Sequence, residues 1–337
     1  MERWPGVFHT QLPAVGTSLI DRVLCFRRFL QLWLRANPCD TIQFRSIFEG
    51  YPLLKLKPRP RLIFEVNGLP SIELKYRYPR AADDRELMSK IVAQERACLE
   101  AADAIVTPSS VTRRFLGAYA DKTRVIPNGV DTDLFHPADH PPETLRLLYF
   151  GTLSSWQGVE LAIRAVGQIA SRTTARLTIL GVGNSTQTGG LSALAAKLGI
   201  ADRIELLPPV DRTEVAGHLR QSFAVLAPLP VNDRNVRQGC CPLKILEGMS
   251  AGVPVIASDL PVVRDLGDHG RHFLLVKPGS VDQLASAILQ LEANPALWKH
   301  IADNARQHIE ANYTWKRAGS ALCEVWEDVA LTLSTSA

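Results

Sequence analysis

In the second half of the chain, short apolar runs alternate with segments whose apolar residues recur at helical spacing. Leu145–Phe150 is an apolar run that ends at Gly151, and Val159, Ala162 and Val166 then follow at helical intervals. Strands that alternate with helices predict a parallel sheet with right-handed crossovers, and hence a doubly wound α/β domain. We predict further strands at residues 175–180, 204–207, 223–227, 253–258 and 273–276, and helices at 191–198, 214–220, 242–250, 282–292 and 296–310.

The first part of the chain is less regular. Its pattern predicts strands at 41–44, 61–66 and 104–107, and helices at 83–101 and 110–119, the latter with Ser109 as its N-cap. The proline-rich stretch 136–142 has the composition of a linker. We therefore predict a first domain at 1–137, a second at 138–310 and a terminal helix at 311–330.

Charge is unevenly distributed along the 337 residues. Residues 1–137 contain 20 Lys and Arg against 15 Asp and Glu, whereas the remainder contains 18 against 19. Residues 23–34 (VLCFRRFLQLWL) predict a basic amphipathic helix. Packing of this helix on a sheet is the favoured interpretation, and a peripheral contact with an anionic membrane surface is the alternative. No run of about 20 apolar residues is present, so no membrane-spanning segment is predicted.

The six cysteines form no CxxC pair and no zinc spacing, which favours a reducing compartment. Residues 1–11 lack the apolar segment of a signal peptide. We therefore expect a cytoplasmic protein, with the inner face of the membrane as its alternative location. The basic residues are not interleaved with aromatic ones as nucleic-acid grooves require, so no nucleic-acid partner is expected.

The most informative stretch for chemistry is 239–252 (GCCPLKILEGMSAG). Pro242 suits the first turn of a helix, and the free N–H groups at such a helix start form an anion site suited to a diphosphate. Lys244 and Glu247 are three residues apart and project from one helix face. A lysine beside a phosphate and a carboxylate beside ribose hydroxyls would together hold a sugar nucleotide. The alternative is a surface Lys/Glu pair on a packed helix.

The stretch GCCPLKILEGMSAGVPVIASDLP resembles the donor-binding signature of the GT-B glycosyltransferases, in particular the retaining group called family 4, or glycosyl transferases group 1. VIPNGVDTDLFHP resembles that family's interdomain segment, and YFGTLSSWQGVELAIRAV resembles the start of its second domain. Residues 180–183 resemble its GxG loop, and 312–315 resemble the start of its terminal helix, which crosses back to the first domain. The matches run in family order across about 61–330.

The resemblance implies two Rossmann-like doubly wound domains that face a cleft. A family first domain normally begins with a strand, a glycine-rich loop and a helix, and nothing before Thr41 matches that order. We therefore expect the first domain to be incomplete, which would leave exposed sheet edges.

The resemblance also implies a role for individual residues. Glu247 would bind the ribose diol, the backbone from Gly239 to Leu243 would hold the sugar and the diphosphate beside Lys244, Gly151 would let the backbone approach the phosphates, and Asn128 would lie at the cleft. The family is retaining, and neither a metal nor another cofactor is expected. The predicted donor-binding residues are Gly151, Trp156, Gln157, Gly181, Gly183, Gly239, Cys240, Cys241, Pro242, Leu243, Lys244 and Glu247, and the predicted catalytic residues are Lys244 and Asn67.

Four positions depart from the family pattern. Gly239 stands where the first of two glutamates is usual, and Thr152 and Gln157 replace a usual Arg and Lys. More of the diphosphate contact therefore falls to Lys244, with Arg234 or Arg237 as possible helpers. Trp156 and Gln157 are predicted to recognise the sugar, a tryptophan wedged between the domains being the alternative. Asn67 replaces the usual histidine and cannot act as a base, so only an orienting role is assigned to it.

Two other motifs suggest metal binding but have a simpler interpretation. Asp131-Thr-Asp133 spells DxD, yet it lies inside the interdomain match. Asp265, Asp268, His269 and His272 span a loop, for which a solvated polar loop is favoured.

The sequence thus predicts a retaining glycosyltransferase that moves a sugar from a nucleoside diphosphate to a sugar, lipid-linked or glycan acceptor, in cell-surface polysaccharide or glycolipid synthesis. One alternative is a catalytically inactive donor-binding fragment that serves as a partner subunit. Another is a sugar-nucleotide epimerase, for which Asn67 and Gly239 lack the required acid and base groups.

Overall fold

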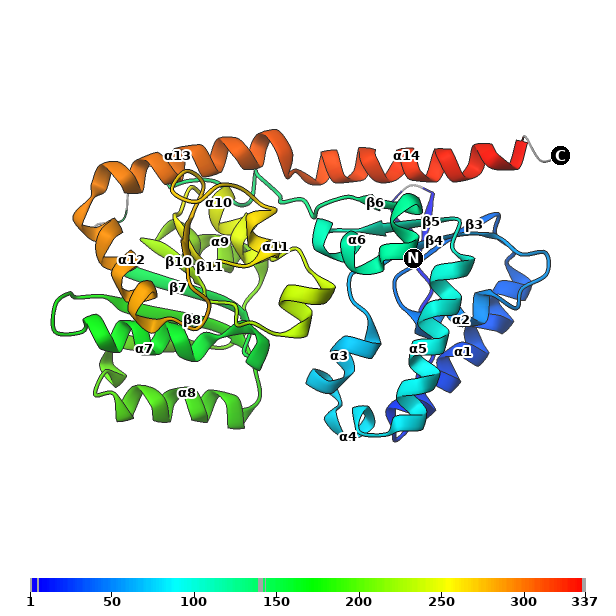
Figure 1. Cartoon of the computed structure of the whole chain (residues 1–337), viewed down its shortest axis with the longest axis horizontal. Coiled ribbons are helices and arrows are strands. Elements are labelled where there is room, and N and C mark those ends of the chain that lie inside the picture. Colours follow the sequence, from blue (N-terminus) through cyan, green and yellow to red (C-terminus); the bar gives the residue numbers. More distant parts are fainter. Residues whose placement is uncertain (1, 5, 139–141, 143, 335–337) are drawn as a thin grey trace. The chain divides into compact units, whose positions relative to one another are not determined.

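The computed structural model describes residues 2–4, 6–138, 142 and 144–334 (Figure 1). The chain forms two compact units. The first comprises Met1–Thr107, Ala118–Arg124 and Glu324–Ala337, and the second comprises Pro108–Gly117 and Val125–Cys323. Each unit is built around its own parallel sheet.

The second unit contains a six-stranded sheet in the order β12-β11-β10-β7-β8-β9. All of its neighbouring strands pair in parallel. Counted from β7, this is the order 3-2-1-4-5-6 of a doubly wound Rossmann-like sheet, so the predicted fold class is confirmed. The strands are β7 (Arg146–Thr152), β8 (Arg176–Val182), β9 (Ile204–Leu207), β10 (Ala224–Ala227), β11 (Val255–Ser258) and β12 (Leu274–Val276).

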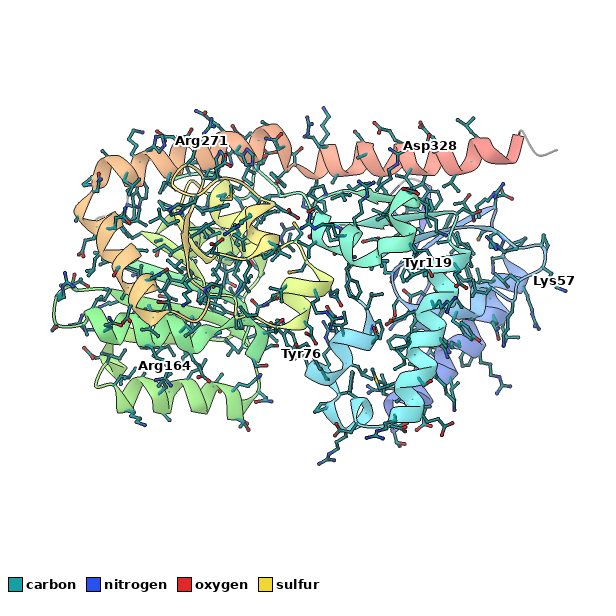
Figure 2. The ribbon with its side chains drawn as sticks, viewed as in Figure 1. Lys57, Tyr76, Tyr119, Arg164, Arg271 and Asp328 are labelled. Carbon is teal, nitrogen blue, oxygen red and sulfur yellow. The ribbon has the colours of Figure 1, made fainter. Side chains whose placement is uncertain are left out.

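Helices cover both faces of this sheet, because successive strand residues point to opposite sides. Leu147 and Tyr149 of β7 join a core with helices α7, α8 and α12, whereas Leu148 and Phe150 join a second core with α9, α10 and α13. Arg164, labelled in Figure 2, is an exposed residue of α7. The helical segments are α6 (Ser110–Leu116), η2 (Ser155–Gln157), α7 (Val159–Ile169), α8 (Ser185–Lys197), η3 (Ala201–Arg203), α9 (Arg212–Arg220), η4 (Arg234–Gln238), α10 (Leu243–Ser250), α11 (Pro261–Arg264), α12 (Val281–Ala293), α13 (Pro295–Asn312) and α14 (Trp315–Ser334), the last of which enters the first unit at Glu324.

The first unit contains a four-stranded sheet in the order β3-β4-β5-β6. Strand β4 pairs in parallel with β3 and with β5. The end of α14 packs in this unit, where Val325 and Val329 are buried and Trp326 Nε1 donates to Gln43 Oε1 at 2.7 Å. Its elements are β1 (Glu2–Trp4), β2 (Val7–Phe8), α1 (Leu19–Ala36), β3 (Thr41–Phe44), α2 (Ile47–Leu53), β4 (Arg61–Glu65), α3 (Pro70–Arg77), α4 (Pro79–Ala82), α5 (Arg85–Ala101), β5 (Ala104–Thr107), η1 (Gly117–Lys122) and β6 (Thr123–Val125).

The sequence pattern located most strands to within two residues and was less accurate for helix ends. Helix α8 begins at Ser185, six residues before the predicted start, because Asn184 and Gln187 form a capping box. Helix α6 ends at Leu116, before Gly117 with its φ of 47°. Helices α2 and α3 were not predicted. The terminal helix begins at Trp315 rather than at residue 311.

The predicted boundary after residue 137 stays a prediction, and the compact second unit already includes residues 125–137. Within the predicted linker 136–142, residues 139–141 lie outside the described residues.

Candidate functional site

The strand order of the second unit reverses between β7 and β10, since β8 follows β7 on one side and β11 follows β10 on the other. Loops that leave the carboxyl ends of two such strands diverge and open a crevice, where ligands of doubly wound sheets bind. The loop after β7 contains η2, and the loop after β10 contains η4 and leads into α10. The predicted donor-binding residues of these two loops therefore lie at the same edge of one sheet.

Lys244, in the first turn of α10, is nearly buried, with 8% of its surface exposed. Its Nζ donates to Gln157 Oε1 at 2.8 Å and lies 3.9 Å from the centre of the Tyr149 ring. Burial, together with the positive charge of Arg234, lowers the pKa of Lys244 to about 7. The sequence suggested that the loop after β7 has no cation, but tertiary packing brings the Lys244 ammonium to it.

Gly151 ends the buried part of β7 and has a φ of 125°. Side chains other than hydrogen are strained in this region of backbone space. A Cβ at this position would lie 3.6 Å from Lys244 Nζ. The glycine therefore leaves open the space beside the ammonium group.

Glu247 lies one turn after Lys244, and 15% of its side chain is exposed. Burial raises the pKa of Glu247 to about 7, and the charges of Arg212 and Lys244 oppose that shift. Arg212 begins α9, its Nη2 is 3.9 Å from Glu247 Oε1, and its guanidinium lies 5.3 Å from the centre of the Phe135 ring. The sequence analysis did not identify Arg212, although its position directly after the N-cap Asp211 was a usable signal.

The start of α10 has no side-chain cap, because Pro242 is its N-cap residue and not a first-turn residue as predicted. Ile245 N donates to Pro242 O at 3.1 Å. The N–H groups of Leu243 and Lys244 precede the first possible acceptor within the helix. Free N–H groups of this kind, together with the helix dipole, are the groups that bind anions at helix starts in general.

Gly239 is enclosed by α6, which explains the missing glutamate. Its φ is 86°, and a Cβ here would lie 2.7 Å from Thr112 Oγ1. Its N–H donates to Arg234 O at 3.0 Å and so already has an acceptor. Any larger side chain at position 239 would displace α6.

The neighbouring cysteines contribute to the core. Cys240 and Cys241 are buried, and burial raises the pKa of the Cys241 thiol to about 12. Asn128 Nδ2 donates to Cys241 O at 3.5 Å, which ties the segment before β7 to this loop. If these cysteines contact a donor, they do so through their backbone.

Gly181 lies near the end of β8 and Gly183 directly follows that strand, and both pack against the loop after β7. A Cβ at Gly181 would overlap the Leu153 side chain, and one at Gly183 would lie 2.7 Å from Leu153 Cδ1. Packing on Leu153 is thus sufficient to explain both glycines. Their contact with a donor stays a prediction.

Residues 5–134 match the family model "Glycosyltransferase Family 4", and residues 144–294 match the model "Glycosyl transferases group 1". The chain belongs to this glycosyltransferase family. A D-inositol 3-phosphate glycosyltransferase of Acidothermus cellulolyticus is 28% identical over 73% of the chain and 58% of its own length. A second protein of that name, from Catenulispora acidiphila, is 26% identical over 72% of the chain and 60% of its own length. The chain thus spans less than two thirds of these relatives.

Solved structures show that the family's GT-B fold is present. Sucrose-phosphate synthase from Thermosynechococcus elongatus superposes with a TM-score of 0.81 at 19% identity, over 97% of this chain and 86% of its own. Anabaena HepE in complex with UDP superposes with a TM-score of 0.70 at 18% identity, over 92% of this chain and 82% of its own.

Asn67 belongs to the first unit, where it follows β4. Its Nδ2 donates to Glu65 Oε1 at 2.6 Å, and Gln43 Nε2 donates to Glu65 Oε2 at 2.7 Å. The carboxylate can only accept, so it fixes the Asn67 amide with its oxygen directed away from Glu65. The orienting role of Asn67 stays a prediction.

Residues of the two suggested metal-binding motifs make hydrogen bonds within the chain. Asp131 Oδ1 accepts from Leu134 N at 3.0 Å, Asp265 accepts from Ser110, and His269 Nδ1 accepts from Leu275 N at 2.9 Å. Within the described residues, no three His, Cys, Asp or Glu side chains gather as a metal site would require. None of the helices among those residues has the length and apolar content that a bilayer crossing requires.

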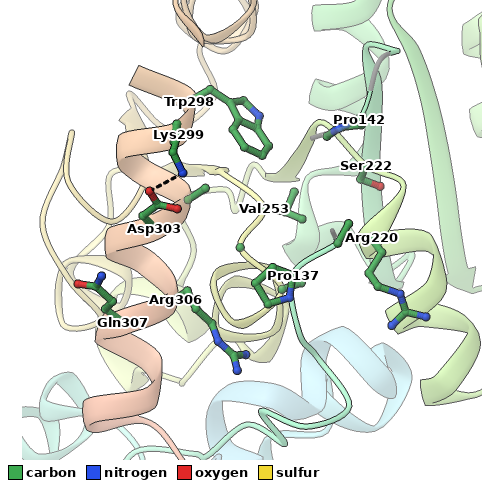
Figure 3. Close-up of a pocket in the computed structure, with 14 residues that line it drawn as sticks. Pro137, Pro142, Arg220, Ser222, Val253, Trp298, Lys299, Asp303, Arg306 and Gln307 are labelled. Carbon is green, nitrogen blue, oxygen red and sulfur yellow. Dashed lines mark ion pairs between the residues drawn. The ribbon is translucent and has the colours of Figure 1, made fainter. Parts of the chain in front are cut away.

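A cavity of about 310 Å³ lies at the other edge of the same sheet (Figure 3). Ser222 and Val253 line it, and they precede β10 and β11, whereas the predicted donor-binding residues of the two loops follow β7 and β10. Lys299 and Asp303 on its wall form an ion pair of 3.0 Å, and Arg306 donates to Phe135 O at 2.8 Å. These three side chains are thus paired with each other or with the backbone, and none of the predicted donor-binding residues lines this cavity.

Proposed function

We propose that this chain is a retaining glycosyltransferase that moves a sugar from a nucleoside diphosphate donor to an acceptor hydroxyl. One observation carries the proposal. A buried Lys244 and a partly buried Glu247 share one face of a helix whose uncapped start lies at the switch point of a doubly wound sheet. Uncompensated burial of a lysine is costly, and an anionic ligand would supply the missing partner.

The donor diphosphate would lie against the N–H groups of Leu243 and Lys244, with the ammonium of Lys244 moving from Gln157 to the phosphate oxygens. Glu247, one turn further, would accept hydrogen bonds from the ribose hydroxyls. Gly151 would leave room for the phosphates. The positive charge at this position is organised before the reaction starts, which is the most effective way to stabilise a leaving diphosphate. In this proposal, neither the binding of the diphosphate nor the binding of the ribose uses a metal ion.

The sugar would be recognised by fewer acidic side chains than is usual in the family. Since Gly239 is enclosed by Thr112, no carboxylate can project from that position. We assign the sugar contacts to the loop containing Trp156 and Gln157, to the backbone of residues 240–243, and to Asn67 as an orienting group. We also retain Gly181, Gly183 and Asn128 as predicted contributors to the site.

Transfer would proceed on one face of the sugar. The bond from the anomeric carbon to the leaving phosphate oxygen breaks, the acceptor oxygen bonds to that carbon, and the acceptor proton passes to the leaving phosphate. The chain's part is to align the two substrates and to stabilise the negative charge on the diphosphate. Asn67 cannot take the proton.

Comparison with related proteins guides the choice of donor and acceptor. HepE has been crystallised with UDP and with UDP-glucose, so we propose a UDP-sugar as the first donor to test. The curated relatives are named for inositol 3-phosphate, a hydroxyl-bearing acceptor. We propose a sugar, lipid-linked or glycan acceptor in cell-surface polysaccharide or glycolipid synthesis, at the cytoplasmic face of a membrane.

The deciding experiment is calorimetric titration of the full chain with UDP, ADP, GDP and the matching nucleosides, without metal. We expect one of the nucleoside diphosphates to bind. Lys244→Ala should lower the affinity for that diphosphate by about 10–100-fold and should change the affinity for the nucleoside little. Equal losses for diphosphate and nucleoside would remove Lys244 from the phosphate site. Binding of no diphosphate at all would overturn the proposal.

Incubation with labelled UDP-glucose and candidate acceptors then separates the rival functions. Transfer with retained anomeric configuration supports the enzyme. Donor binding without transfer to any acceptor would favour the partner-subunit alternative. Interconversion of the donor sugar would favour the epimerase.

A further inference from the structure

We infer that Asn235 is a positioning residue of the donor site, whose side-chain amide clamps the loop after β10 to the loop after β7. The inference rests on the proposed function for its consequence, but its geometry stands independently. Asn235 lies in η4 and is completely buried.

The amide of Asn235 makes hydrogen bonds to both loops. Its Nδ2 donates to Trp156 O at 3.1 Å and to Pro230 O at 2.9 Å. Trp156 belongs to the loop after β7, and Pro230 belongs to the loop after β10. One NH₂ group therefore bridges two backbone segments that are 74 residues apart in sequence.

The two loops also meet at Gly158, two residues after Trp156. Gly158 has a φ of 71°, and a Cβ at this position would overlap Pro228 O and lie 3.3 Å from Pro230 Cδ. The loops therefore contact each other closely at Gly158 as well as through the Asn235 amide. Their separation is fixed by packing as well as by hydrogen bonds.

The backbone of Asn235 is held as firmly as its side chain. Asn235 N donates to Asn232 Oδ1 at 2.9 Å, and Gly239 N donates to Arg234 O at 3.0 Å to close the single π-helical turn. Such turns are rare and are frequently found at functional sites. The amide therefore has little freedom to leave the two carbonyl groups.

The clamp determines where Gln157 can reach. Gln157 directly follows Trp156, and its Oε1 accepts from Lys244 Nζ. A shift of the Trp156 carbonyl would move Gln157 away from the ammonium group and admit water to it. By holding Trp156, Asn235 sets the width of the crevice in which the diphosphate of the proposed donor would lie.

Only a buried group with two N–H donors can perform this task. Asp has the same shape, but its ionised carboxylate has no hydrogen-bond donor and would face two carbonyl oxygens. Ala would remove the hydrogen bonds from Asn235 Nδ2 to Trp156 O and to Pro230 O, which favours opening of the loops.

The test compares Asn235→Ala and Asn235→Asp with Asn294→Ala. The control removes the Asn294 side-chain cap of α13, which accepts from Leu297 N at 3.0 Å in the same unit and away from both loops. The first readout needs no ligand. Competitive labelling of amines as a function of pH, followed by mass spectrometry, reports the pKa of Lys244, which is about 7 with the clamp intact.

We expect both Asn235 variants to raise the pKa of Lys244 towards its ordinary value of 10.5, because water reaches the ammonium group. The second readout is binding of UDP and uridine. Loss of the clamp should weaken the binding of UDP by about tenfold and the binding of uridine by less than about twofold. The loss of a hydrogen-bonded arrangement typically changes an affinity by a factor of about ten. The control should match the wild-type chain in both readouts at temperatures well below unfolding.

An unchanged pKa of Lys244 in both Asn235 variants would overturn the inference, even if the variants melt at lower temperature. If the wild-type chain binds no diphosphate, the proposed function fails, but the labelling profile still decides whether the clamp exists. If both variants fail to fold, Asn232→Ala provides the same labelling test with a smaller perturbation, because it removes one of the two acceptors of Asn235 N and the Asn232 donor to Pro230 O.

Discussion

The ammonium group of Lys244 lies 3.9 Å from the centre of the Tyr149 ring, although the two residues belong to α10 and β7. The ring is held in place because its hydroxyl donates to Thr152 O at 2.6 Å. An aromatic face attracts a cation, but less strongly than the water that burial removes. Burial therefore outweighs the attraction of the ring and leaves Lys244 with a pKa of about 7.

This relationship predicts that diphosphate binding takes up a proton. Burial lowers the pKa of Lys244 to about 7, and a bound diphosphate raises it. Below pH 7 the lysine is already charged, so affinity is highest there. As pH rises from 7 towards 9, UDP affinity should fall by up to about tenfold per pH unit. Calorimetry in buffers of different ionisation enthalpy measures the proton uptake.

The matched variant for this prediction is Lys244→Arg, because a guanidinium remains charged throughout this range. Its UDP affinity should be almost independent of pH between 7 and 9. The same decline in wild type and variant would mean that another group titrates.

The carboxylate of Glu247 should lower the stability of the folded chain and strengthen the binding of the nucleoside. Burial raises its pKa to about 7 from 4.5, so the folded state binds the proton more tightly than the unfolded chain. Its stabilising contribution is present below pH 4.5 and is lost as pH rises to 7. Glu247→Gln mimics the protonated form and should therefore raise the free energy of unfolding at pH 8 by about 1 kcal/mol or more. It should also weaken nucleoside binding, by about 1.5–3 kcal/mol if the ribose contact is charge-assisted.

Urea unfolding at pH 5 and pH 8 measures the first effect, and uridine titration measures the second. A variant that is destabilised equally at both pH values would show that Glu247 is ionised and well paired in the folded protein.

Gly151→Ala should destabilise the second unit by about 1–3 kcal/mol, because the φ of 125° is unfavourable for alanine. The new methyl group would also lie 3.6 Å from Lys244 Nζ and narrow the proposed phosphate position. The control is Gly190→Ala in α8, where nothing lies within 4 Å of the new Cβ. That substitution should stabilise the chain by about 0.5–1 kcal/mol through helix propensity. Thermal melting of both variants checks the opposite signs.

Acid should destabilise the second unit through two stacked histidines. The rings of His272 and His308 are 4.2 Å apart, and His272 Nδ1 accepts from Asp268 N at 2.9 Å. Burial is the main cause that lowers the pKa of both imidazoles. The unfolded chain therefore binds protons more readily, so stability is lost as pH falls below 6.5.

His308→Phe keeps a ring in the stack and removes one titrating group. The difference in melting temperature between pH 7.5 and pH 5 should then be smaller than in the wild-type chain. His300→Gln, at an exposed position of α13, should leave that difference unchanged. A wild-type melting temperature that does not fall at pH 5 would contradict the stacked neutral pair.

Local patterns in the sequence were sufficient for much of the fold. Alternation of apolar runs with helical spacing predicted the doubly wound sheet, and Ser109 was recognised as an N-cap, which its contact with Val111 N confirms. Helix α2 was missed because Pro52 lies inside it, although Ser46 and Glu49 form a capping box that was legible in the sequence. Helix α8 was shortened because its first residues are polar, and its start depends on the cap and not on apolar spacing.

The sequence by itself determined the fold class, the family and the face that Lys244 and Glu247 share, because these follow from residue spacing along one strand or helix. Tertiary structure decided which residues surround them. Only folding brings Gln157, Tyr149 and Arg212 to α10, and Asn235 to Trp156, because these partners come from separate strands whose carboxyl ends meet at one edge of the sheet. Burial at that edge then lowers the pKa of Lys244 and raises that of Glu247, and burial is a property of the packed chain that no local pattern encodes.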